Sequence, residues 1–202
     1  MTVRVIFVAP AIGPALRQAR FGGEGSVDGS DPLDAAGVRA ARAAAPGLPA
    51  AAHRYVSPTD RCRRTAEELA VPDAVDEPAL HGCATGRWSG RTLDEVMAEE
   101  PQAVLEWLAD PAAAPHGGES VRQLCARVGS WLDGTAAALG GRVLVVAEPD
   151  VVRAAAVHAL GAPDGAFRRI DVPPLSGVEL TGRADRWNLR LGLVRPLTDR
   201  AG

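Results

Sequence analysis

Two short apolar runs constrain the fold of this chain more than any other feature. The first spans Val3 to Val8 and the second Arg142 to Val146. Runs of this length, rich in β-branched residues, are typical of strands buried inside a mostly parallel sheet. The first run ends in Ala9-Pro10-Ala11 and the second in Ala147-Glu148-Pro149-Asp150. Because ligands of such sheets bind beyond the carboxyl ends of the strands, we expect the functional site at these two segments.

The rest of the chain alternates between helical and extended patterns. Helices are predicted at 33–45 and 61–70 and through most of 92–139, and further strands at 52–56, 169–172, 177–180 and 187–191. Ser57 or Thr59 can cap the helix that carries Arg61, which places Arg61 in its first turn. The order predicts one α/β domain over residues 1–202, a three-layer α/β/α arrangement with a mostly parallel central sheet.

Composition excludes several kinds of chemistry. All 22 basic residues are arginine, so no lysine is available for a Schiff base or a P-loop. The net charge of -3 and the scattered arginines argue against nucleic acid as a partner. Three cysteines without metal-ligand spacing predict neither a disulfide framework nor a metal site. No apolar run reaches the roughly 20 residues that a membrane span needs, so we expect a cytoplasmic protein, and the arginine and alanine bias suggests a bacterial source.

A series of motifs between the two apolar runs adds a family resemblance. The motifs are, in order, Pro32-Leu33-Asp34-Ala35-Ala36-Gly37, Ser57-Pro58-Thr59-Asp60-Arg61-Cys62-Arg63-Arg64-Thr65-Ala66, Leu80-His81-Gly82-Cys83-Ala84-Thr85-Gly86-Arg87-Trp88-Ser89-Gly90 and Pro115-His116-Gly117-Gly118-Glu119-Ser120. Each is weak alone, but together and in this order they resemble the histidine phosphatase superfamily, the phosphoglycerate-mutase-like proteins. The resemblance covers almost the whole chain and implies that family's fold.

The same resemblance implies a phosphate pocket of two histidines, two arginines and a carboxylate, most of which this sequence lacks. Ala9-Pro10-Ala11 stands where the family has R-H-G with its nucleophilic histidine, Glu148 stands for the second histidine, and Gly82 for the acidic proton donor. Only Arg61 matches. Neither proline nor glycine can attack phosphorus or protonate a leaving group, so we expect a degenerate member without phosphoryl transfer.

The candidate site residues follow from these positions. Glu148, Arg61 and His81 are the candidates for catalysis, and Pro10, Ala11, Cys83, Trp88 and Asp150 are the candidates for substrate binding. Simpler roles stand beside these. Arg61 could form a structural ion pair with Asp60, Glu148 or Asp150, Asp150 could merely cap the following helix, and His81 and Cys83 could be solvated or packed.

Three functions remain open from the sequence. The first is a non-phosphatase module that binds a small molecule or a protein partner, with a homodimer as one possibility. The second is a repurposed acid/base enzyme, an isomerase, cyclase or lyase of bacterial specialised metabolism that uses Glu148 and Arg61. Residual phosphatase or mutase activity is the third and the least favoured. No cofactor is expected in any of them.

Overall fold

The fold places six strands in one mixed sheet in the computed structural model, which describes residues 2–22, 32–183 and 186–190. The strands are β1 (Val3–Val8), β2 (His53–Val56), β3 (Val75–Asp76), β4 (Gly141–Val146), β5 (Gly177–Arg183) and β6 (Arg186–Arg190). Their order across the sheet is β3-β2-β4-β1-β5-β6. β1 to β4 run parallel, whereas β5 and β6 add an antiparallel hairpin beside β1. The predicted α/β class is confirmed, with a mixed sheet.

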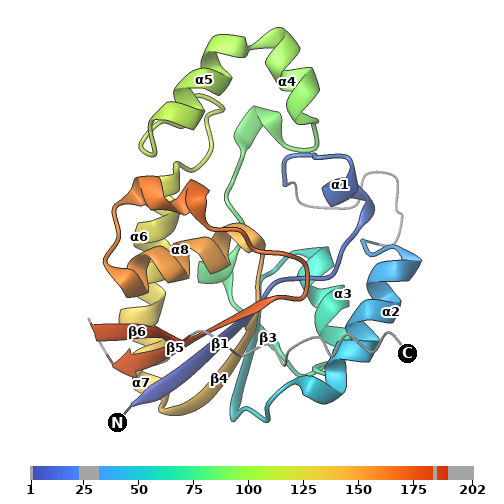
Figure 1. Ribbon diagram of the computed structural model, residues 1–202, viewed down its shortest axis with the longest axis vertical. Helices are drawn as coiled ribbons and strands as arrows, with labels where there is room; N and C mark the ends of the chain where they lie inside the picture. The colour runs from blue at the N-terminus through green and yellow to red at the C-terminus, as the bar shows by residue number, and fades with distance from the viewer. Residues whose placement is uncertain (1, 23–31, 184–185, 191–202) are drawn as a thin grey trace, which may run out of the picture.

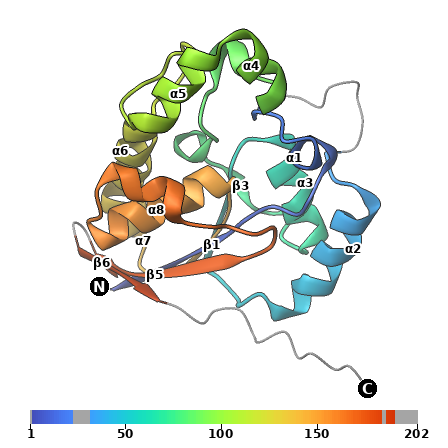
Figure 2. The same cartoon turned by 45° about the horizontal axis from the view of Figure 1, so that its top comes forward.

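Two layers of helices cover the sheet (Figures 1 and 2). One face carries α6 (Val121–Trp131), a π-helical turn at Leu132–Ala136, α7 (Ala137–Leu139) and α8 (Pro149–Leu160). The other face carries α2 (Ala35–Ala44) and α3 (Asp60–Glu68). The alternation of side chains along β1 explains both cores: Val5 and Phe7 pack with α6 and α8, while Ile6 and Val8 pack against α2 and α3.

A helical cap rises beyond the carboxyl ends of the strands. This cap, residues 86–116, contains η4 (Gly86–Trp88), α4 (Leu93–Glu99) and α5 (Pro101–Ala109). It has a small core of its own, in which Trp88 and Val104 are fully buried and Phe21 and Trp107 pack against them. The two chain segments at its base lie close together, since a Cβ atom at Gly118 would stand 2.0 Å from the carbonyl oxygen of Ala84.

Short elements connect these parts. They are α1 (Pro14–Arg17), η2 (Ala45–Gly47), η3 (Pro78–Leu80) and η6 (Asp164–Arg169). No helix in the described ranges is long and apolar enough to cross a membrane.

The structure corrects two of the predicted segments. The strand predicted at 169–172 is wrong, because η6 occupies 164–169 and the residues up to Gly177 are irregular. The end of that irregular segment extends the pairing of β5 with β1: the Ala9 amide donates to the Ser176 carbonyl at 2.9 Å, and the Leu175 amide donates to the Ala9 carbonyl at 3.2 Å. The helical stretch 92–139 is real but is interrupted between α5 and α6.

Candidate functional site

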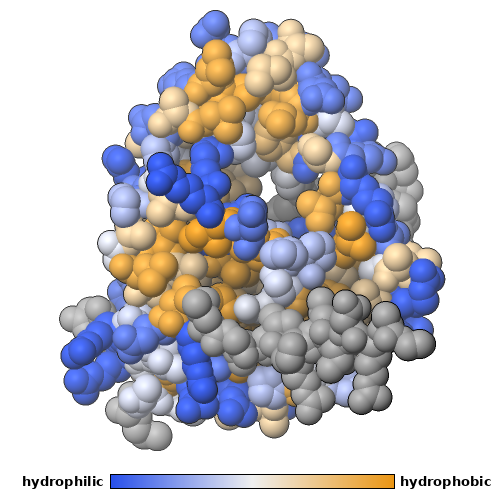
Figure 3. All heavy atoms as spheres, viewed as in Figure 1, coloured by the Kyte–Doolittle hydropathy of each residue, from blue (hydrophilic) through white to orange (hydrophobic). Residues whose placement is uncertain are grey.

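The candidate site lies where β1, β4 and β2 end side by side. β1 and β4 are neighbours in register, Val8 opposite Val146, as the two apolar runs predicted. The ladder continues past their ends, since the Ala147 amide donates to the Val8 carbonyl at 3.0 Å and the Ser57 amide to the Val146 carbonyl at 2.8 Å. Seen from the side of Figure 1, the molecular surface is hollowed between the cap and this edge of the sheet (Figure 3).

Glu148 and Arg61 form an ion pair at this edge. The Thr59 hydroxyl accepts from the Cys62 amide and so caps α3, which fixes Arg61 in the first turn, pointing back to the strand ends. The Arg61 guanidinium donates to one carboxylate oxygen of Glu148, and the Thr59 hydroxyl donates to the other at 2.8 Å. Both oxygens of Glu148 are therefore occupied by partners from α3.

The pair is largely withdrawn from water. The Arg61 side chain is 17% exposed and that of Glu148 is 16% exposed. Burial acts to lower the pKa of Arg61, but the adjacent Glu148 carboxylate outweighs it and raises that pKa overall, so the guanidinium stays charged. Burial, followed by the Glu148 charge, raises the pKa of the neighbouring Cys62 thiol, which is therefore protonated.

Asp150 is a second partly buried carboxyl group, two residues further along. One of its oxygens accepts from the Cys83 amide at 2.5 Å and the other from the Val151 amide at 2.8 Å. It thus fixes the segment around Gly82 to the start of α8. Burial and then the Glu148 charge raise the pKa of Asp150 above its usual value. A Cβ atom at Gly82 would stand 3.3 Å from Glu148 Cγ and 3.6 Å from an Asp150 carboxylate oxygen.

A second ion pair, between Arg127 and Glu119, holds this segment through backbone carbonyls. Arg127 on α6 donates to both carboxylate oxygens of Glu119, at 2.9 and 2.6 Å, and also donates to the carbonyls of Ala79 and His81. Neither Arg127 nor Glu119 is among the site residues predicted from the sequence. Glu119 could have been found, because it lies in one of the quoted motifs. Arg127 could not, because nothing in the sequence distinguishes it from other arginines in a helix.

The other predicted site residues divide into two groups. His81 and Cys83 lie beside the carboxyl groups, but the His81 ring nitrogen Nδ1 lies 2.5 Å from the Gly82 carbonyl oxygen, and the Cys83 thiol donates to the Glu119 carbonyl at 3.2 Å. Burial, with the Asp150 charge next, raises the pKa of Cys83 to about 12. Neither side chain forms a hydrogen bond or ion pair with Glu148 in the described part of the chain.

Three predicted binding residues are buried instead. The indole of Trp88 is fully buried in the cap core rather than exposed at the strand ends. Ala11 packs in the core between the sheet and α3, and its amide donates to the Thr65 hydroxyl at 3.1 Å. Pro10 is buried as well. Trp88 and Ala11 belong to the packed cores of the protein, and the charged groups at the strand ends are Glu148, Arg61 and Asp150.

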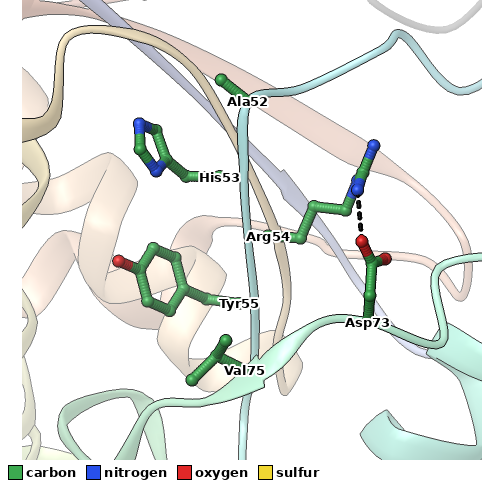
Figure 4. Close-up of a pocket in the computed structure, with 6 residues that line it drawn as sticks. All are labelled: Ala52, His53, Arg54, Tyr55, Asp73 and Val75. Atoms are coloured by element: carbon green, nitrogen blue, oxygen red, sulfur yellow. Dashed lines mark hydrogen bonds and ion pairs between the residues drawn. The ribbon is translucent and has the colours of Figure 1, made fainter.

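A separate hollow of about 190 Å³ lies away from this site, against β2 and β3. Figure 4 shows His53 and Tyr55 on one side of β2 and Arg54 on the other, where it donates to Asp73 at 2.5 Å. None of the predicted site residues lines it, and no group of three side chains suited to a metal ion occurs within the residues that the structure describes.

Solved structures share this fold at low sequence identity. A mycobacterial glucosyl-3-phosphoglycerate phosphatase is 24% identical with a TM-score of 0.78, and the match covers 96% of this chain and 100% of that one. The α-ribazole phosphatase from Shigella flexneri is 18% identical with a TM-score of 0.80, over 93% and 94% of the two chains. YhfR from Bacillus stearothermophilus is 19% identical with a TM-score of 0.80, over 93% and 95%.

Sequence comparison gives the family. No curated protein matches the chain. The model of the histidine phosphatase superfamily, branch 1, matches residues 17–192, which is most of the sequence. The order of strands, the capped helix with Arg61 and this match lead to one conclusion: the chain belongs to the histidine phosphatase superfamily.

Proposed function

We propose that this protein has lost phosphoryl transfer and uses the fold to bind a small molecule or a protein partner. The observation that carries the proposal is the ion pair between Glu148 and Arg61 at the strand ends. The resemblance implies that Arg61 would hold a phosphate, but here its charge is already matched by a carboxylate. A phosphate about 4 Å from Glu148 would be repelled by roughly 4 kcal/mol per charge pair at intermediate dielectric.

The positions of the histidines support the same proposal. The chain has four, and none lies in the segments that end β1 and β4. His53 begins β2, His116 is buried at the base of the cap, and His158 on α8 lies 3.1 Å from Asp133. Pro10 occupies the place that the resemblance gives to the nucleophile, and proline offers neither a ring nitrogen nor a backbone donor.

The phosphatase activities in the names of the similar structures do not decide this function, because activity belongs to the site and not to the fold. The proposed ligand is a small molecule that tolerates the carboxylates of Glu148 and Asp150. A bacterial biosynthetic setting and a location in the cytoplasm form part of the same proposal.

A repurposed acid/base enzyme is the second candidate, and Asp150 favours it. A partly buried carboxyl group with a raised pKa beside a charged pair is the kind of group that exchanges protons with a substrate. In this version Glu148, Arg61 and Asp150 act on a substrate without phosphate, in an isomerisation, cyclisation or elimination.

A direct test looks for the covalent intermediate. The purified protein is incubated with p-nitrophenyl phosphate, and its intact mass is measured under conditions that preserve phosphohistidine. We expect no phosphorylated species, either in the wild type or in Pro10→His, because that variant still lacks an acid at Gly82 and a second histidine at position 148. Phosphorylation of the wild type at any of its four histidines would contradict the proposal.

A further inference from the structure

Two partly buried arginines beside the candidate site have no carboxylate partner in the described part of the chain. They are Arg153 on α8 and Arg168 on η6. Most other arginines of the described ranges, including Arg61 and Arg127, form ion pairs with aspartate or glutamate. Placing charged side chains out of water without a counter-ion is costly, so an unpaired partly buried arginine calls for an explanation.

Both guanidinium groups are held in place by contacts with aromatic rings and carbonyls. Arg168 stacks on Trp107 with its Cζ atom 4.1 Å from the ring centroid, and it donates to the Trp107 carbonyl at 2.6 Å. Arg153 donates to the Ile170 carbonyl at 2.8 Å and lies 5.8 Å from the centroid of the Phe167 ring. The protein therefore orients both groups while leaving their charge unmatched.

Arg168 retains an unused donor in the interior. Its Nε–H is buried and has no acceptor within the residues that the structure describes. Burial lowers the pKa of Arg168, and the nearby charge of Arg153 acts in the same direction. A buried donor without a partner is costly, so the unmatched Nε–H adds to the cost of holding the Arg168 charge without a counter-ion.

The two arginines lie next to the candidate site and under the cap. Arg153 follows Asp150 by three residues, so both lie on the same side of α8, one turn apart. Arg168 joins η6 to the cap through Trp107. In the view of Figure 3, strongly hydrophilic side chains gather over η6, between the apolar surfaces of the cap and of the α8 side.

We propose that Arg153 and Arg168 form a subsite for an anionic group, a carboxylate or a phosphate, carried by the ligand whose other end lies toward Glu148 and Asp150. This inference rests on the proposed function, since it places the anion-binding charge away from the strand ends where the family resemblance would put it. Planar guanidinium groups suit both anions, because each presents parallel N–H donors to two oxygens. The ligand class is thus a small organic anion with a neutral or cationic second part.

Inorganic phosphate and citrate serve as probes for the two kinds of anion. Each is titrated into the full-length protein while the Nε–H signals of the arginines are followed by NMR, at low and at raised ionic strength. The variants are Arg153→Gln and Arg168→Gln, with Arg61→Gln to report on the strand ends. Arg169→Gln is the matched control, because Arg169 is an exposed neighbour on the same element without an ion pair in the described ranges. Thermal melts verify that every variant is folded.

The outcomes separate the two proposals. We expect at least one probe to bind with a Kd near or below about 1 mM and to bind at least about tenfold more weakly to Arg153→Gln and Arg168→Gln, while the matched control Arg169→Gln leaves binding unchanged. The tighter probe then assigns carboxylate or phosphate. If neither probe binds, or if Arg169→Gln weakens binding equally, the subsite is refuted while the proposed function stands. Binding that depends on Arg61 alone would overturn both.

Discussion

Breaking the ion pair between Glu148 and Arg61 tests whether this pair stabilises the folded protein. Removing one partner of a fully buried ion pair costs about 3–5 kcal/mol, whereas exposed pairs contribute about 0–1 kcal/mol. These side chains are 16–17% exposed, and glutamine at position 148 can keep hydrogen bonds to Thr59 and Arg61. We therefore expect Glu148→Gln to lower the free energy of unfolding by about 2 kcal/mol, or the melting temperature by roughly 4–8 °C.

A double-mutant cycle isolates the pairwise energy. Glu148→Gln, Arg61→Gln and the double variant are compared with wild type by urea denaturation, and we expect a coupling of about 2 kcal/mol, because the double variant leaves no charge unpaired. The exposed pair of Arg63 and Asp76, with side chains 43% and 48% exposed, is the matched control and should couple by less than about 1 kcal/mol. If the effects of the two substitutions on the free energy of unfolding add within about 0.5 kcal/mol, the two side chains do not interact appreciably, and Glu148 does not neutralise Arg61.

Three further predictions concern single groups. Because burial raises the pKa of Asp150, its contribution to stability is present at low pH and is lost as the pH rises through that pKa. The stability advantage of wild type over Asp150→Asn, measured by urea denaturation, should therefore shrink as the pH is raised above about 4, and an advantage that grows would be evidence against the raised pKa. With a pKa of about 12, the Cys83 thiol is ionised to only roughly one part in 10⁴ at pH 8. Iodoacetamide should therefore label Cys83 far more slowly in the native protein than in urea. Equal labelling rates would disprove its burial. Gly118→Ala should destabilise the base of the cap by more than about 1 kcal/mol, since the new Cβ atom would overlap the Ala84 carbonyl. Faster proteolysis of the cap would report this loss. An unchanged melting curve and digest would be inconsistent with the close approach of Gly118 to Ala84.

The fold was predictable because its strongest signals are local. Apolar runs identify β1 and β4 as central strands, and the Thr59 cap locates the start of α3. The direction of β5 was not predictable, since a strand inside the sheet can show the same apolar pattern whether it runs parallel or antiparallel to its neighbours. The strand predicted at 169–172 failed because the apolar residues there pack beside η6 rather than in the sheet.

The site was predictable only in part. The juxtaposition of Glu148 and Arg61 followed from the strand ends and the helix cap, and the structure confirms that they meet. Burial of Trp88 was missed because a tryptophan in a glycine-flanked loop gives no sign of the separate cap core that encloses it. The roles of Arg127 and Arg168 were missed because both depend on contacts between distant segments, which leave no spacing in the sequence.

The most direct test of the account is the hydrolysis of p-nitrophenyl phosphate by the purified protein, with Arg61→Gln assayed beside it. A chain without a histidine nucleophile at Pro10 and without an acid at Gly82 should give no release of nitrophenol above that of the variant. Turnover by the wild type that is lost in Arg61→Gln would contradict the account, because it would mean that Arg61 still binds a reacting phosphate despite its pairing with Glu148.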